Sequence, residues 1–178
     1  MASLGHVVFG LAVARTTKVR SVLSLLAFPA LALLPDLDVI AFAFGIPYRD
    51  QFGHRGASHA IATGLVMGAL IGWLLARVTG MMRPRSGALA GAIAMISHGL
   101  LDTLTDGGEG VALLWPLTSE RFFAPWQPIP VAPIGLGFLS QRGLYCAAVE
   151  LALFAPFLIY ALWPRRGVRS RSPNESGA

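Results

Sequence analysis

Three of the four histidines and three aspartates of an otherwise apolar chain lie in three short motifs. The motifs are Pro35-Asp36-Leu37-Asp38, His54-Arg55-Gly56-Ala57-Ser58-His59 and His98-Gly99-Leu100-Leu101-Asp102. Burying ionisable groups among apolar residues is costly unless the groups pair with one another or bind a metal. We therefore interpret the three motifs as a metal site. The alternative is a set of separate buried polar residues that hydrogen-bond to backbone.

The spacing within each motif decides which side chains can reach one ion. His98 and Asp102 are four residues apart, so on a helix they share one face. Asp36 and Asp38 would point to nearly opposite sides of a regular α-helix. Both can reach one site only if the backbone is extended or irregular there, and Pro35 favours such a break.

Mixed histidine and carboxylate ligation suits zinc, and also manganese or iron. Two such ions can activate water and hold the oxygens of a phosphoester. Asp36 or Asp38 is then a candidate for bridging the ions or acting as a base, and Arg55 is a candidate for binding a phosphate in a bidentate manner. An equally open role for Arg55 is a charge at the membrane interface. The motif residues that could hold one or two ions are Asp36, Asp38, His54, His59, His98 and Asp102.

The composition is that of an integral membrane protein. Of the 178 residues, 54% are hydrophobic and 13% are charged, whereas soluble domains carry about 25% charged residues. The net charge is +5, and the basic residues flank the apolar runs instead of lining one face as in a nucleic-acid-binding protein. The single Cys146 excludes an intramolecular disulfide and a cysteine-rich zinc motif.

The apolar runs predict an all-α, polytopic membrane protein. Leu4 to Ala14 forms a short N-terminal helix, since a span needs about 20 residues. About four transmembrane helices follow, at Val22–Ile46 with a break at the Asp36 motif, Ala60–Thr79, Gly87–Asp106 and Leu144–Trp163. Ser58 is the expected N-cap of the second span, and Gly107-Gly108 the expected end of the third. Glu150, inside the fourth span, is expected to pair with Arg142, and a place at the metal site is the open alternative.

Three basic clusters predict the orientation. They lie at residues 15–20, 77–85 and 165–171, on one side of a four-span topology, and positive residues favour the cytoplasm. The loops 47–59 and 107–143, and with them the site, then face outward. Residues 1–164 form one membrane-embedded domain, and residues 165–178 form a basic cytoplasmic tail.

The motifs in this order resemble one known family. His6 in a small apolar segment, the three motifs, the Asp-Thr-Leu-Thr-Asp-Gly-Gly continuation from Asp102 and then Leu114-Trp115-Pro116 resemble the YdjM-type bacterial inner-membrane proteins over residues 1–165. These are described as LexA-regulated, and a metal-dependent hydrolase activity has been inferred for them. The resemblance implies a place in the bacterial inner membrane and the metal-site residues His6, Asp36, Asp38, His54, His59, His98 and Asp102. The His-x3-Asp helix is also similar to one in zinc-dependent phospholipase C.

We therefore expect a membrane-embedded, metal-dependent hydrolase. Zinc is the expected metal, and a phosphoester of a lipid or envelope precursor is the candidate substrate. Two alternatives stay open. The first is a structural or partner-binding membrane protein that a metal stabilises. The second is an ion or proton transporter, for which four spans are few and no inverted repeat is evident.

Overall fold

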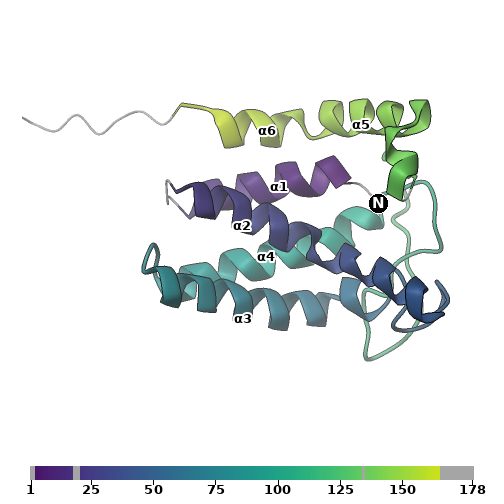
Figure 1. The fold of residues 1–178 in the computed structure, drawn as a ribbon, viewed down its shortest axis with the longest axis horizontal. Helices are drawn as coiled ribbons and strands as arrows, with labels where there is room; N and C mark the ends of the chain where they lie inside the picture. The colour runs from purple at the N-terminus through teal and green to yellow at the C-terminus, as the bar shows by residue number, and fades with distance from the viewer. Residues whose placement is uncertain (1–2, 18–20, 134, 165–178) are drawn as a thin grey trace, which may run out of the picture.

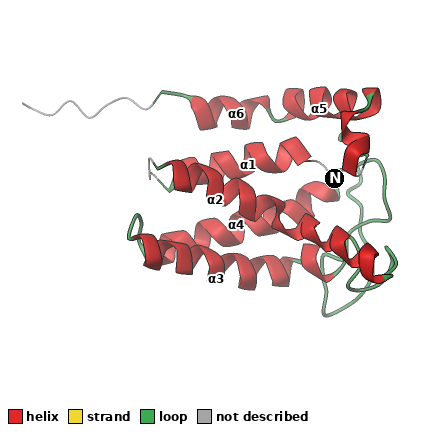
Figure 2. Ribbon diagram, in the orientation of Figure 1, coloured by secondary structure: helices red, strands yellow, loops and turns green. Residues whose placement is uncertain are grey.

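The computed structural model describes residues 3–17, 21–133 and 135–164, and helices joined by loops make up this part of the chain. Within it there are two isolated β-bridges and no strand (Figure 2). The predicted all-α class is confirmed. The elements are α1 (Ser3–Thr16), α2 (Val22–Leu33), η1 (Leu34–Phe44), η2 (Ala57–His59), α3 (Ile61–Thr79), α4 (Pro84–Asp102), η3 (Gly135–Leu139), α5 (Gln141–Leu153) and α6 (Ala155–Leu162), where η denotes a 3-10 helix.

The helices lie side by side in an elongated bundle, and the long loops gather at one end (Figure 1). The opposite end holds the C-terminal ends of α1, α3 and α6. There, Arg15 at the end of α1 donates a hydrogen bond to the carbonyl of Trp163, which follows α6. The loop end and the opposite end are therefore chemically distinct.

The first apolar run changes helix type where Pro35 enters. α2 ends at Leu33, and the 3-10 helix η1 continues to Phe44 with Pro35 in its first turn. A 3-10 helix has about 3.0 residues per turn, so Asp36 and Asp38 lie about 120° apart around its axis, compared with about 160° in an α-helix. The predicted irregular backbone is confirmed, and it brings the two carboxylates closer to one side.

Two described helices are long and apolar enough to cross a membrane, Val22–Phe44 and Ile61–Thr79. The α5–α6 pair adds a third if a bend of 64° at its break is accepted within one span. The predicted third span, α4, has 19 residues but is less apolar than the other two because it includes Arg85, His98 and Asp102. The count of four spans therefore stays a prediction.

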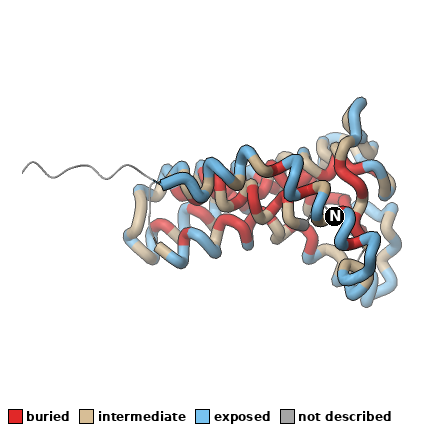
Figure 3. Tube along the Cα trace, turned by 90° about the horizontal axis from the view of Figure 1, so that it is seen from above, coloured by how far each residue is buried: buried red, intermediate tan, exposed pale blue. Residues whose placement is uncertain are grey.

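α4 occupies the centre of the bundle and packs on α1, α2 and α3. Its contact with α3 uses the glycine face expected from the sequence, since a Cβ on Gly68 would lie 2.5 Å from the carbonyl oxygen of Gly91. Seven residues of α4 between Ala90 and Gly99 are buried in addition to His98, and buried positions line the inner faces of the bundle (Figure 3). The polar end of α4 thus enters the protein interior.

Two predicted helix boundaries are wrong. α4 ends at Asp102 instead of Asp106 because the chain then turns, and the amide of Asp106 bonds to the carbonyl of Ile129 at 2.9 Å. α3 begins after Ala60, with no side-chain cap. Ser58 lies in η2 instead, where its hydroxyl donates to Asp38 Oδ2. In both places a tertiary hydrogen bond replaces the local capping signal.

Candidate metal centre

The predicted site residues meet where four elements converge at the loop end of the bundle. α1 supplies His6, η1 supplies both aspartates of its first turns, and α4 supplies His98 and Asp102. His59 lies in η2, just before α3. All seven predicted residues contact at least one other member of the set, in hydrogen bonds or ion pairs of 2.6–3.9 Å or in ring contacts.

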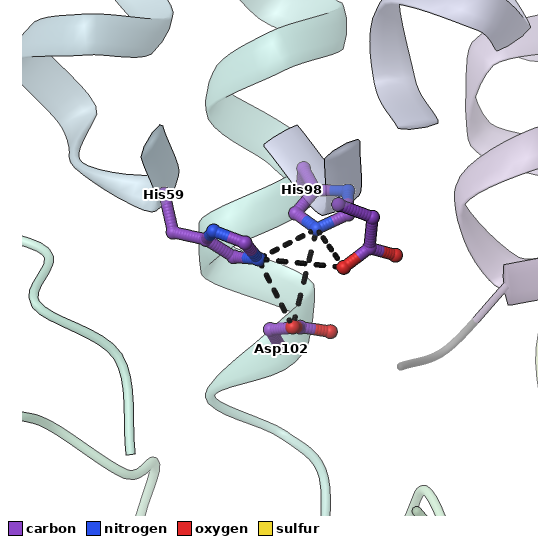
Figure 4. A group of neighbouring side chains, drawn as sticks. His59, His98 and Asp102 are labelled. Carbon is purple, nitrogen blue, oxygen red and sulfur yellow. Dashed lines mark hydrogen bonds and ion pairs between the residues drawn. The ribbon is translucent and has the colours of Figure 1, made fainter. Parts of the chain in front are cut away.

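Four of these residues form a buried group that could hold one metal ion, Asp36, His59, His98 and Asp102. Figure 4 shows the two imidazoles and the Asp102 carboxylate pointing toward one another. His59 Nε2 and His98 Nε2 lie 3.0 Å apart. His59 Nε2 lies 3.6 Å from Asp36 Oδ1 and 3.5 Å from Asp102 Oδ2, and the corresponding distances from His98 Nε2 are 3.4 and 3.9 Å.

These distances match the edges of a tetrahedral zinc site. Zinc binds nitrogen and carboxylate oxygen at about 2.0–2.1 Å, so neighbouring ligand atoms in a tetrahedron lie about 3.3–3.4 Å apart. Five of the six ligand pairs are given above, and their distances scatter around that value. The donor set of two imidazoles and two carboxylates therefore fits a single transition-metal ion.

Charge and hydrogen bonding in the group also fit a cation. The site encloses the carboxylates of Asp36, Asp38 and Asp102, and among the arginines and lysines that the structure describes, Arg55 is the one whose side chain pairs with them, through Asp102. Within the described residues, both carboxylate oxygens of Asp36 are buried without a hydrogen-bond partner, while Oδ2 of Asp102 lies 2.9 Å from Arg55 Nε. Buried anionic oxygens without partners are costly, and a bound dication removes that cost.

Outer hydrogen bonds fix which nitrogen of each imidazole faces the group. His98 Nδ1 donates to the carbonyl oxygen of Ala32 at 2.6 Å, which directs Nε2 toward His59 and the carboxylates. His59 Nδ1 lies 3.1 Å from Asp38 Oδ2, so its Nε2 is also directed inward. Such partners orient metal-binding histidines and increase their basicity. Sequence reasoning had missed Ala32 because a backbone carbonyl carries no residue signature.

His6 belongs to the same cluster, as the family resemblance implied. Its ring stacks on His98 with centroids 3.9 Å apart, and its Nε2 lies 3.2 Å from Asp102 Oδ1. His59 and His98 instead lie near Oδ2, the other oxygen of this carboxylate. His6 therefore contacts the carboxylate from outside the four-residue group.

A second group, Asp38, His54 and His59, could also hold an ion by ligand type and distance. It shares His59 with the first group. His54 Nδ1 and Asp38 Oδ1 are 2.6 Å apart, the length of a direct charge-assisted hydrogen bond. The same carboxylate thus contacts both loop histidines.

Arg55 is held by an unusual backbone conformation and by three side-chain contacts. Its φ is 61°, a left-handed value that few residues other than glycine adopt and that occurs often at functional sites. Nε lies 2.9 Å from Asp102 Oδ2, and Nη1 donates to Thr105 Oγ1 and the Gly107 carbonyl, each at 3.0 Å. The carbonyl of Gly107, which was expected to end a helix, therefore accepts a hydrogen bond from a guanidinium.

The carboxylates also change the acid–base behaviour of His59. Burial alone would lower its pKa. Hydrogen bonding to Asp102, Asp36 and Asp38 outweighs burial and raises the pKa of His59 to about 10. The carboxylates around His59 thus favour positive charge at this position.

Two acidic residues considered from the sequence lie outside this cluster. Asp106 is exposed and accepts a hydrogen bond from the amide of Val131. Glu150 is buried, and its Oε2 accepts a hydrogen bond from the amide of Gly5 in the first turn of α1. The expected partner, Arg142, instead places its guanidinium over the ring of Tyr145. Glu150 thus contacts the helix that carries His6.

Comparison with known proteins agrees with this arrangement of motifs. Residues 1–168 match the family described as YdjM inner membrane protein. The chain is also 44% identical over 144 residues to the inner membrane protein YbcI of Escherichia coli (strain K12), covering 76% of this chain and 80% of YbcI. No solved structure matches the chain. The family match extends over nearly the whole chain, and this protein belongs to the YdjM inner membrane protein family.

Proposed function

We propose that this protein is a membrane-embedded, metal-dependent hydrolase that acts on a phosphoester. The observation that carries the proposal is the convergence of His59 Nε2, His98 Nε2 and one oxygen each of Asp36 and Asp102 within 4.8 Å of one another. Zinc suits this donor set best, and manganese or iron also accept it. A bound dication supplies Lewis-acid chemistry, polarising a phosphoryl oxygen and activating water.

The chain's own residues have separate roles in this proposal. Asp36, His59, His98 and Asp102 hold the ion. Asp38 holds His59 and His54 in position, as outer carboxylates commonly do for metal-binding histidines. In this proposal His59 binds the ion through Nε2, and its Nδ1 stays bonded to Asp38. His59 then has no nitrogen for a second ion, so we infer one ion instead of two.

Arg55 is the remaining charged residue of the site. Its guanidinium lies beside Asp102, and Nη2 has no hydrogen-bond partner among the described residues. A guanidinium is suited to bind an anionic oxygen of a substrate or transition state. We propose that Arg55 has this role and His6 a positioning role through Asp102.

The proposed setting is the bacterial inner membrane, with four spans and the site at the outer face. The support is the position of Arg15, Arg77, Arg83 and Arg85 at the bundle end opposite the site, since basic residues favour the cytoplasm. Residues 3–164 are proposed as one membrane-embedded domain. The cytoplasmic tail expected at 165–178 lies outside the described residues.

One observation favours a second candidate, a metal-stabilised structural or partner-binding membrane protein. Four protein ligands in a buried site are typical of structural zinc, whereas catalytic zinc usually keeps one position for water or substrate. Both candidate proteins bind the metal, but only the hydrolase converts a substrate.

Metal analysis of the detergent-purified protein tests the metal site. We expect about one ion per chain in the wild type and in Ser97→Ala, and roughly a tenth or less in His98→Ala, because a zinc site that loses one of its ligands binds far more weakly. Ser97 is the control because it is buried in the same helix, and its hydroxyl donates a hydrogen bond to the carbonyl of Ala94 within that helix. Equal, near-zero metal in all three proteins would exclude a metal site.

Turnover then separates the two candidates. Phospholipid in mixed micelles and a generic phosphodiester should be hydrolysed by the wild type, and hydrolysis should stop in His98→Ala and in chelator-treated protein. A stoichiometric ion without turnover on either substrate would support the structural candidate.

A further inference from the structure

A cavity of about 170 Å³ lies at the loop end of the bundle, beside the proposed metal group. Tyr48, His54, Arg55, Gly108 and residues 131–133 line it. Pockets that enclose a whole drug-sized molecule measure about 300–1,000 Å³. A space of this size therefore accommodates a headgroup and not an entire lipid or nucleotide.

Arg55 gives this cavity a buried positive charge with a spare donor. The residue is 1% exposed. Nε and Nη1 face Asp102, Thr105 and the carbonyl of Gly107, and Nη2 is the guanidinium nitrogen without a partner in the described chain. A buried donor without a partner costs free energy that an anionic ligand can recover.

Gly108 leaves space for such a ligand, and a second guanidinium, that of Arg121, lies near the cavity wall. A Cβ on Gly108 would lie 2.8 Å from Tyr48 Oη and 2.9 Å from Arg55 Nη1, so a side chain at that position would close in on both groups. Arg121 lies 5.5 Å from the centre of the Tyr48 ring. Burial raises the pKa of Tyr48, so its hydroxyl remains a neutral donor.

The cavity wall lies next to exposed apolar side chains of η1, the element that ends the first candidate span. Phe42 is 39% exposed on η1, and its ring lies 6.3 Å from those of Tyr48 and His54, which both line the cavity. Leu37, Ile40 and Phe44 on the same element are also exposed. A ligand in the cavity can therefore keep apolar chains against η1.

We propose that this cavity binds the phosphate of a membrane lipid with a small headgroup, such as phosphatidate, through the Nη2 of Arg55. The same guanidinium contacts Asp102, so the phosphate lies next to the proposed metal group. The inference rests on the proposed hydrolase function and adds the substrate class. A phosphate group from a soluble phosphomonoester shares this chemistry, and the experiment separates the two sources.

The test measures lipid binding to the full-length, detergent-purified protein after treatment with a chelator. The probes are phosphatidate and phosphatidylcholine in neutral micelles, and inorganic phosphate and glycerol 3-phosphate in solution. The variants are Arg55→Gln, Val131→Phe, which fills the cavity from a different wall, and the control Arg49→Gln. Arg49 is exposed at the same end of the bundle and pairs with Glu109.

We expect phosphatidate to bind more tightly than the other three probes. Arg55→Gln and Val131→Phe should each weaken it at least about tenfold, the effect of losing one hydrogen bond to a charged group. Arg49→Gln should change it by less than about twofold, as for an exposed ion pair. If Arg55→Gln does not insert into the membrane, the phosphatidate affinity of Val131→Phe alone tests the inference.

Equal affinity in the wild type and both cavity variants would overturn the inference. Binding of glycerol 3-phosphate as tight as that of phosphatidate would retain the anion site and overturn the lipid source. Because the protein is metal-free, the two proposals fail separately. If the protein never holds metal but binds phosphatidate through Arg55, only the hydrolase proposal is overturned. If it holds metal but its lipid binding does not depend on Arg55, only the lipid site is overturned.

Discussion

Asp36 and Asp38 contact different histidines, although only Leu37 separates them. Asp36 Oδ1 faces the Nε2 atoms of His59 and His98. Asp38 instead bonds to His54 and to the Nδ1 side of His59. The 3-10 backbone of η1 directs the two carboxylates to opposite sides of one imidazole. We infer that Asp36 is a ligand and that Asp38 orients ligands.

This difference predicts unequal effects of neutralising the two residues. Asp36→Asn should leave no metal after desalting, because an amide oxygen is a poor replacement for a carboxylate ligand. Asp38→Asn should retain the ion with affinity about 10–100-fold weaker, the usual cost of losing an outer partner. Competition with a chelator of known affinity measures both, and Asp50→Asn in the exposed loop is the control. Full retention in Asp36→Asn with loss in Asp38→Asn would reverse the two roles.

At the scale of elements, α1 reaches the site because its first turn is held by α5. Glu150 Oε2 accepts the amide hydrogen of Gly5 at 2.8 Å, and a Cβ on Gly5 would lie 2.6 Å from the ring of Phe154. An acidic side chain is favourable at a helix N-terminus. The next residue, His6, is thereby held against His98 and Asp102. The packing of α1 on α5 and α6 thus positions one member of the cluster.

Replacing Glu150 should therefore loosen α1. Glu150→Ala leaves the Gly5 amide without a partner, which costs about 1–3 kcal/mol in a buried position. Glu150→Gln keeps an acceptor and should cost clearly less. Thermal unfolding in detergent compares these variants with Leu151→Ala, which changes an exposed neighbour on the same helix. An unfolding temperature of Glu150→Ala equal to that of Leu151→Ala would show that the contact does not hold α1.

At the scale of the whole molecule, charge and chemistry occupy opposite ends of the bundle. The arginines at the ends of α1 and α3 and at the start of α4 lie at one end, and the His/Asp cluster lies at the other (Figure 1). Because basic residues favour the cytoplasm, this separation predicts a site accessible from the outer side of the membrane.

Cysteine labelling tests the orientation. In a Cys146→Ala background, a cysteine at Gln127 in the loop end should react with a membrane-impermeant thiol reagent in intact cells, and a cysteine at Ser86 should react only after permeabilisation. Both positions are exposed, and Cys146 is buried. Labelling of the Ser86 position alone in intact cells would invert the topology.

The sequence by itself determined the helical class, the apolar segments and the identity of the polar residues. Long apolar runs predict helices because each run must satisfy its own backbone in lipid. The break at Pro35 and the shared face of His98 and Asp102 follow from local geometry. These properties depend on neighbours within a few residues, so composition and spacing contain them.

Only the tertiary structure decided how the polar residues divide. It grouped Asp36, His59, His98 and Asp102, assigned Asp38 to His54, and stacked His6 on His98. It also ended α4 at Asp102 and moved Ser58 from a helix cap to Asp38. These pairings join residues 16 to 96 positions apart. They are set by the packing of α1, η1 and η2 on α4, which no local pattern encodes.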